Sequence, residues 1–182
     1  MSSSSEDTKV RSPDDAATRT ATIAAVTTPA KWFVLGGIIG GTLDLAYALT
    51  FSALRGVPPM RILQAIASGV LGKPSFTGGA TTAALRLLLH FLIAIAAAGV
   101  FYAASRRFGW LVRHAVVAGI VFGLCVYAVM NAIVLPLSAI PFKLTYAPLA
   151  LVTDLLSHMF LFGVPIALCI RAGYAGGWGR RG

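Results

Sequence analysis

The stretch Thr82–Ser105 has the sequence TAALRLLLHFLIAIAAAGVFYAAS, and it decides the fold. An α-helix needs roughly 20 predominantly apolar residues to cross the hydrocarbon core of a bilayer, and this stretch has that length. Its only charged or basic side chains are Arg86 and His90. A run this long and this apolar predicts a transmembrane helix.

Three further apolar runs have a similar length and extend over Trp32–Leu54, His114–Leu137 and Leu149–Ile170. Hydrophobic residues make up 57% of the 182-residue chain, and its mean hydropathy is +0.81. Such a composition is too apolar for an ordinary soluble domain. We therefore predict an all-α fold, an integral membrane four-helix bundle surrounded by the lipid bilayer.

The ends of the chain differ from this apolar centre. Residues 1–30 are rich in Ser, Thr, Ala and charge, with little hydrophobic periodicity, and this predicts a disordered cytoplasmic tail. We expect the four-span transmembrane domain to cover 31–172, followed by a flexible C-terminal tail over 173–182.

The topology follows from Lys and Arg in the connections. One side carries Lys9, Arg11, Arg19, Lys31, Arg106, Arg107, Arg113, Arg171, Arg180 and Arg181, and the other carries Arg55, Arg61, Lys73 and Lys143. This bias predicts a multi-pass protein of the bacterial plasma (inner) membrane with both termini in the cytoplasm. The net charge of +9 invites a nucleic-acid partner. We expect none, because the charges are scattered at the ends of the apolar runs.

The segment Val57–Lys73 predicts an additional short helix on the outer side. Two prolines near its start suit a first helical turn, and apolar residues recur at helical spacing after them: Ile62, Leu63, Ile66 and Val70. The segment is too short to span, so the helix is either interfacial or re-entrant.

Ionisable residues within the spans predict where the function lies, because such groups are costly in hydrocarbon and usually face a bundle interior or a water pocket. Arg86 and His90 are four residues apart and share a helix face, as do Asp154 and His158. The predicted topology gives the two pairs the same depth. We therefore expect Arg86 to pair with Asp154 and the two histidines to approach each other.

Three more polar residues complete the predicted site. Asp44 lies near the midplane without an obvious charged partner, so it is either protonated or a proton relay. Tyr47, three residues on, can donate a hydrogen bond to it, and Asn131 lies in the outer half of the third span. The predicted outer-half polar pocket thus comprises Asp44, Tyr47, Arg86, His90, Asn131, Asp154 and His158.

Three functions are compatible with this pocket. The first is a non-enzymatic membrane protein that handles protons or a small polar solute. The second is a structural or assembly subunit whose polar groups only hold helices together. The third is a haem-binding redox protein with His90 and His158 as axial ligands. We expect no catalytic residues, no metal and no cofactor for the first two, since the sequence lacks phosphate-loop, dinucleotide and zinc-site motifs.

Glycine pairs spaced by four residues allow helix backbones to approach closely. They occur in the first and third spans as Gly36, Gly37, Gly40, Gly41, Gly119 and Gly123. The contact they make is either internal or between the subunits of a homo-oligomer.

The chain resembles a group of small bacterial four-helix inner-membrane proteins. The resemblance rests on Gly37–Tyr47, on Arg61–Gln64 with Ala67–Gly69, on Tyr127–Asn131 with Leu135–Ser138, and on His158, and it covers most of 33–171. A more distant similarity, to the YagU-like family, rests on the proline-rich outer loop and the helix with His158. The resemblance implies a bacterial plasma-membrane location and no known reaction or cofactor.

Overall fold

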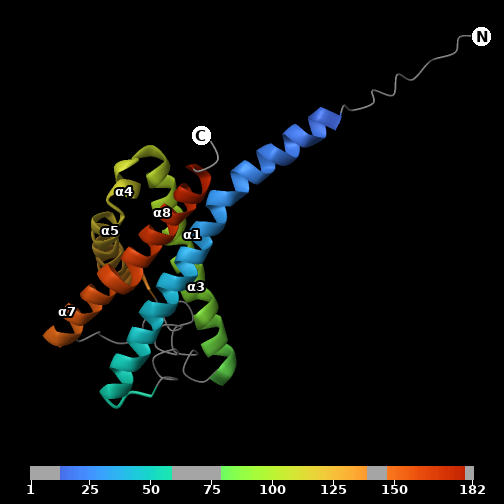
Figure 1. Ribbon diagram of the computed structural model, residues 1–182. Helices are drawn as coiled ribbons and strands as arrows, with labels where there is room; N and C mark the ends of the chain where they lie inside the picture. The colour runs from blue at the N-terminus through green and yellow to red at the C-terminus, as the bar shows by residue number, and fades with distance from the viewer. Residues whose placement is uncertain (1–12, 59–78, 139–146, 179–182) are drawn as a thin grey trace, which may run out of the picture.

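The computed structural model of the chain describes residues 13–58, 79–138 and 147–178. Within these ranges the regular structure is entirely helical (Figure 1). Helix α1 spans Pro13–Leu54 and α3 spans Gly79–Arg107. The one-turn helix α4, Trp110–Arg113, leads into α5, Ala115–Val129.

The last two long helices each contain a π-helical segment. After α5 the chain continues through η2, Met130–Val134, into α6, Leu135–Leu137. The final helix consists of α7, Pro148–Ser157, then η3, His158–Gly163, then α8, Val164–Trp178.

Four helices are long and apolar enough to cross a membrane, over Lys31–Leu54, Thr81–Arg107, Ala115–Leu137 and Pro148–Ala175. The prediction of four long apolar helices is therefore confirmed, with boundaries close to those expected. Helix α1 begins at Pro13 and so includes most of the segment predicted as a disordered tail. The division into tail, membrane domain and C-terminal tail stays a prediction. Most of the predicted helix over 57–73 lies outside the described residues.

The helices pack as a bundle in which α1 and the final helix are central. Helix α1 contacts both α3 and α8, and α5 packs against η3 and α8 on the other side. Helix α1 ends, and α3 and α7 begin, at one end of the bundle, which we call the distal end (Figure 1). The opposite end holds the C-terminal part of α8.

The glycine pairs make these contacts within a single chain. A methyl group added at Gly37 would lie 2.7 Å from the Ile95 backbone, and one at Gly119 would lie 2.7 Å from the Cα of Val164. Gly40 similarly faces the Phe162 carbonyl oxygen, at 2.9 Å. These positions tolerate no side chain without a shift of the neighbouring backbone. Self-association of the chain stays a prediction.

The apolar core lies away from the distal end. It consists mainly of alanines with a few large side chains: Ala94, Ala98, Phe101, Ala115, Ala118, Phe162, Ile166, Ala167 and Ile170. The outer faces are also apolar, and Leu88, Leu92 and Val100 on α3 are 60–65% exposed. Soluble monomers rarely expose continuous apolar faces, so these surfaces are suited to lipid.

Proline accounts for both π-helical segments. The widened turn of η3 is marked by the Val164 N–H, which donates to the carbonyl of Met159, five residues earlier. Each π segment is followed by one cap residue and then by a proline, Pro136 after η2 and Pro165 after η3. Proline lacks an N–H and its ring crowds the carbonyl four residues before it, so a wider turn relieves the clash. π-Helical turns recur at functional sites, and η3 begins at His158.

Candidate functional site

Asp44 is the centre of a polar cluster between α1 and the final helix. Its Oδ1 accepts a hydrogen bond from the Ser157 hydroxyl at 3.1 Å and lies 3.7 Å from Nδ1 of His158. The side chains of Asp44 and His158 are each only 15% exposed. Asp44 thus has a titratable partner that depth along the span did not predict.

The ring of His158 lies between two carboxylates. Its Nδ1 is 3.7 Å from Oδ1 of Asp44 and 3.8 Å from Oδ1 of Asp154. The same nitrogen is 3.0 Å from the Asp154 backbone oxygen. A carbonyl oxygen only accepts, so a hydrogen bond there requires a proton on Nδ1. Tyr127 packs edge-on against the ring, with 5.5 Å between the centroids.

Arg86 and His90 approach this cluster from α3. Arg86 is 7% exposed, and its Nε has no hydrogen-bond partner among the described residues. The Nε2 of His90 donates to the Gly41 carbonyl at 2.8 Å, which joins α3 to α1. We call Asp44, Arg86, His90, Ser157 and His158 the polar cluster.

The predicted Arg86–Asp154 ion pair is absent from the described part of the chain. The ion pairs found there are those of His158 with Asp44 and with Asp154. The reason is packing, since α3 lies mainly against α1.

The remaining predicted residues surround the cluster. Tyr47 donates to the hydroxyl of Thr153 at 2.7 Å, rather than to Asp44. Asn131 donates to the Tyr127 carbonyl at 3.0 Å, four residues earlier on its own helix. Tyr47 therefore joins α1 to α7, whereas Asn131 satisfies its own helix.

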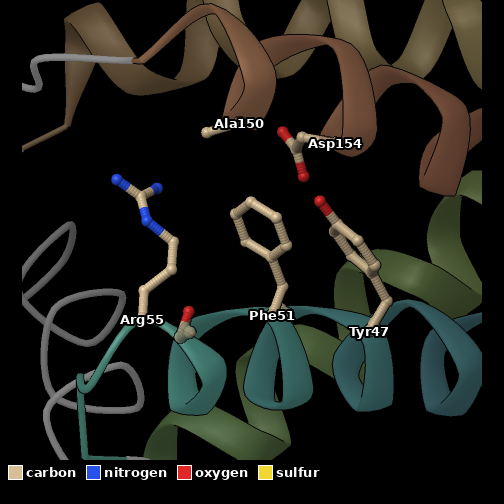
Figure 2. A pocket seen from close by; sticks show the side chains of 7 residues that line it. Tyr47, Phe51, Arg55, Ala150 and Asp154 are labelled. Carbon is tan, nitrogen blue, oxygen red and sulfur yellow. The ribbon is translucent and has the colours of Figure 1, made fainter.

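A pocket of about 300 Å³ lies beside the cluster, on the side of the distal end, and Figure 2 shows the side chains that line it. It lies between α1 and α7 and is lined by Tyr47, Ala48, Phe51, Ser52, Arg55, Ala150 and Asp154. Asp154 is 42% exposed. One carboxylate thus belongs both to the pocket and to the surroundings of His158.

Sequence reasoning missed several of these residues. Phe51 and Arg55 follow Tyr47 at successive intervals of four, so all three share a face of α1. This spacing was the available signal for a lined groove. Ser157 gave a weaker signal, since small hydroxyl residues are common in membrane helices.

The contacts described above involve Nε2 of His90 and Nδ1 of His158. They do not involve the other ring nitrogen of either histidine. Among the described residues there is no group of three or more His, Cys, Asp or Glu side chains that could hold a metal ion. Cys125 and Cys169 are free thiols.

No family model matches the chain, and comparison with curated proteins and with solved structures finds no match either. The resemblance to small bacterial inner-membrane proteins, and to the YagU-like family, stays a prediction. The function of the chain is therefore inferred from the geometry of the polar cluster and the pocket.

Proposed function

We propose that the chain is a multi-pass protein of the bacterial inner membrane, with both termini in the cytoplasm, that moves protons through the polar cluster. The observation that carries the proposal is the position of His158 Nδ1, which lies within 3.8 Å of two carboxylates, the 42% exposed one of Asp154 and the 15% exposed one of Asp44. An imidazole between two carboxylates is a common proton relay, because histidine titrates near neutral pH.

A proton passes from the pocket to Asp44 in two transfers through His158. The imidazolium form of His158 gives its Nδ1 proton to the Asp44 carboxylate, which leaves a neutral ring and a carboxylic acid. A protonated Asp154 then returns a proton to Nδ1 and becomes a carboxylate, which water in the pocket reprotonates. Asp44 releases its proton to water on the opposite side of the cluster and is again a carboxylate, ready for the next transfer. Both distances exceed hydrogen-bond length, so the ring turns towards each carboxylate in succession or a water bridges the gap.

Proton flux into proteoliposomes tests the proposal. An internal pH dye should report flux when a pH gradient is imposed, and Asp44→Asn or His158→Gln should each abolish it. His114→Gln is the matched control, because His114 is exposed at the other end of α5 and should leave flux unchanged. Wild-type flux equal to that of empty liposomes contradicts the proposal.

A structural role is the second candidate. It is favoured by three hydrogen bonds that join different helices: Tyr47 to Thr153, His90 to Gly41 and Ser157 to Asp44. A purely structural cluster predicts no wild-type flux and lower thermal stability in the same variants. Flux and stability measured on the same preparations therefore separate the two functions.

A further inference from the structure

The pocket carries opposite charges on its two sides. Arg55 comes from the end of α1, Asp154 comes from α7, and the Phe51 ring lies between them (Figure 2). The Tyr47 hydroxyl points towards the side occupied by Asp154 (Figure 2). The lining is therefore cationic on one side, anionic on the other and aromatic between.

Neither charge is neutralised by the other. The Arg55 guanidinium lies over the Phe51 ring, 5.5 Å from its centroid, and pairs with no carboxylate among the described residues. Asp154 has His158 as its only ion-pair partner there, at 3.8 Å. Both groups retain hydrogen-bonding capacity towards the pocket.

The spacing along α1 sets the length of a ligand that reaches both charges. Tyr47 lies at the level of Asp154 and is eight residues from Arg55. The Cα atoms of Tyr47 and Arg55 are therefore about 12 Å apart along the axis of α1. The Arg55 guanidinium carbon lies 5.5 Å from the centroid of the Phe51 ring. A ligand with adjacent charges falls short, whereas one with several bonds between its charges fits a pocket of about 300 Å³.

We propose that this pocket binds an extended zwitterion. Its cationic group lies against Asp154 and Tyr47, its anionic group against Arg55, and its apolar linker against Phe51. Cation–π contact with the aromatic rings adds to the ion pairs. This inference rests on the proposed function only through Asp154, which belongs both to the proton relay and to the zwitterion site. The same chemistry occurs in free ω-amino acids and in the headgroup of phosphatidylethanolamine.

Binding of soluble probes to the full chain in a zwitterion-free detergent tests the proposal. By isothermal titration, 6-aminohexanoate should bind more tightly than glycine. Its N-acetyl form, which lacks the cation, and its amide, which lacks the anion, should each bind about tenfold more weakly. Equal binding of all four probes overturns the zwitterion.

Variants assign the two ends. Asp154→Asn should weaken 6-aminohexanoate binding about tenfold and leave the N-acetyl form unaffected, whereas Arg55→Gln should weaken 6-aminohexanoate similarly and leave the amide unaffected. Arg113→Gln, at the opposite end of the bundle, is the matched control and should change neither. If one variant loses the preference for 6-aminohexanoate over both the N-acetyl form and the amide, the assignment of Asp154 to the cation and Arg55 to the anion is wrong.

A measurement in lipid distinguishes a phosphatidylethanolamine headgroup from a free ω-amino acid. If the headgroup is the occupant, phosphatidylethanolamine nanodiscs should raise the melting temperature of the wild type above that in phosphatidylglycerol nanodiscs, and Asp154→Asn should remove the difference. If the protein responds neither to the soluble probes nor to the lipid, the proposal is wrong. Asp44→Asn distinguishes it from the relay, because that change should abolish proton flux while zwitterion binding persists.

Discussion

Asp44 on α1 and His158 at the start of η3 face each other across the interface of those helices, with 3.7 Å between Oδ1 and Nδ1. Ser157, the preceding residue, fixes the same carboxylate oxygen through a hydrogen bond of 3.1 Å. The Asp44 side chain is therefore held by two consecutive residues of the final helix at the point where that helix widens.

A double-mutant cycle should show that these two side chains are coupled. Polar contacts between membrane helices contribute about 0.6 kcal/mol on average and up to about 1.7 kcal/mol. We expect Asp44→Asn and His158→Gln together to destabilise the protein by less than the sum of the single changes, by about that amount. Asp44→Asn with His114→Gln is the control and should be additive. Unfolding in mixed micelles measures both cycles.

The two tyrosines beside the cluster should differ in their contributions to stability. Tyr47 donates to Thr153 at 2.7 Å, whereas the Tyr127 hydroxyl lies 3.5 Å from the Leu151 carbonyl. Tyr47→Phe should lower the unfolding free energy by about 0.6–1.7 kcal/mol. Tyr127→Phe removes the same atom from a long contact and should change it little. Similar losses in both variants would show that the hydroxyls act through something other than these bonds.

Close packing at Gly123 should be sensitive to a single methyl group. A Cβ there would meet the His158 carbonyl and lie 2.7 Å from the Cα of Met159. Gly123→Ala should lower the unfolding free energy by about 1–3 kcal/mol, as overpacking does. Gly99→Ala is the matched control, because its Cβ would lie 3.7 Å from the Phe33 ring. Equal destabilisation of the two variants would contradict the observed packing.

The helices were predictable from sequence because length and hydropathy alone identify an apolar span. The partner of Arg86 was not, because depth along a span does not fix rotation about the helix axis. Arg86 and Asp154 have similar depths, yet α3 packs mainly on α1. The π-helical turn of η3 was not predicted either, because its signal, Pro165, was a single residue inside an apolar run.

The pocket was only partly predictable for a different reason. Asp154 and Tyr47 were identified as polar residues within spans, and both line it. Arg55 was interpreted as a topology signal at the end of a span, and Phe51 was not singled out within its apolar run. Their joint role depends on α7 lying opposite that face of α1, which is a tertiary relationship.

The proposed topology predicts the location of two fusion points. Gly56 follows α1 in a turn with φ of 77°, and Gly182 ends the chain. A phosphatase reporter that is active only outside the cytoplasm should be active after Gly56 and inactive after Gly182. Immunoblots of the two fusions control for expression. The reverse pattern would place the distal end of the bundle in the cytoplasm.

The final prediction concerns the charge that Arg86 balances. Arg86 is 7% exposed and lies on α3, which packs mainly on α1, the helix that carries Asp44, while the predicted partner Asp154 contacts His158 instead. Loss of one member of a buried charged pair costs about 3–5 kcal/mol in soluble proteins and less in membranes. Arg86→Gln should therefore destabilise the protein clearly more than Arg106→Gln, at the exposed end of α3.

Rescue identifies the partner of Arg86. If Arg86 balances the Asp44 carboxylate across the contact between α3 and α1, its removal leaves that carboxylate uncompensated, and Arg86→Gln with Asp44→Asn should recover part of the lost stability. Arg86→Gln with Asp154→Asn should recover none, because that carboxylate is 42% exposed and faces the pocket. Unfolding of the three variants in the same detergent measures the difference. Rescue by Asp154→Asn alone would restore the pairing expected from sequence and contradict the arrangement of α3 against α1.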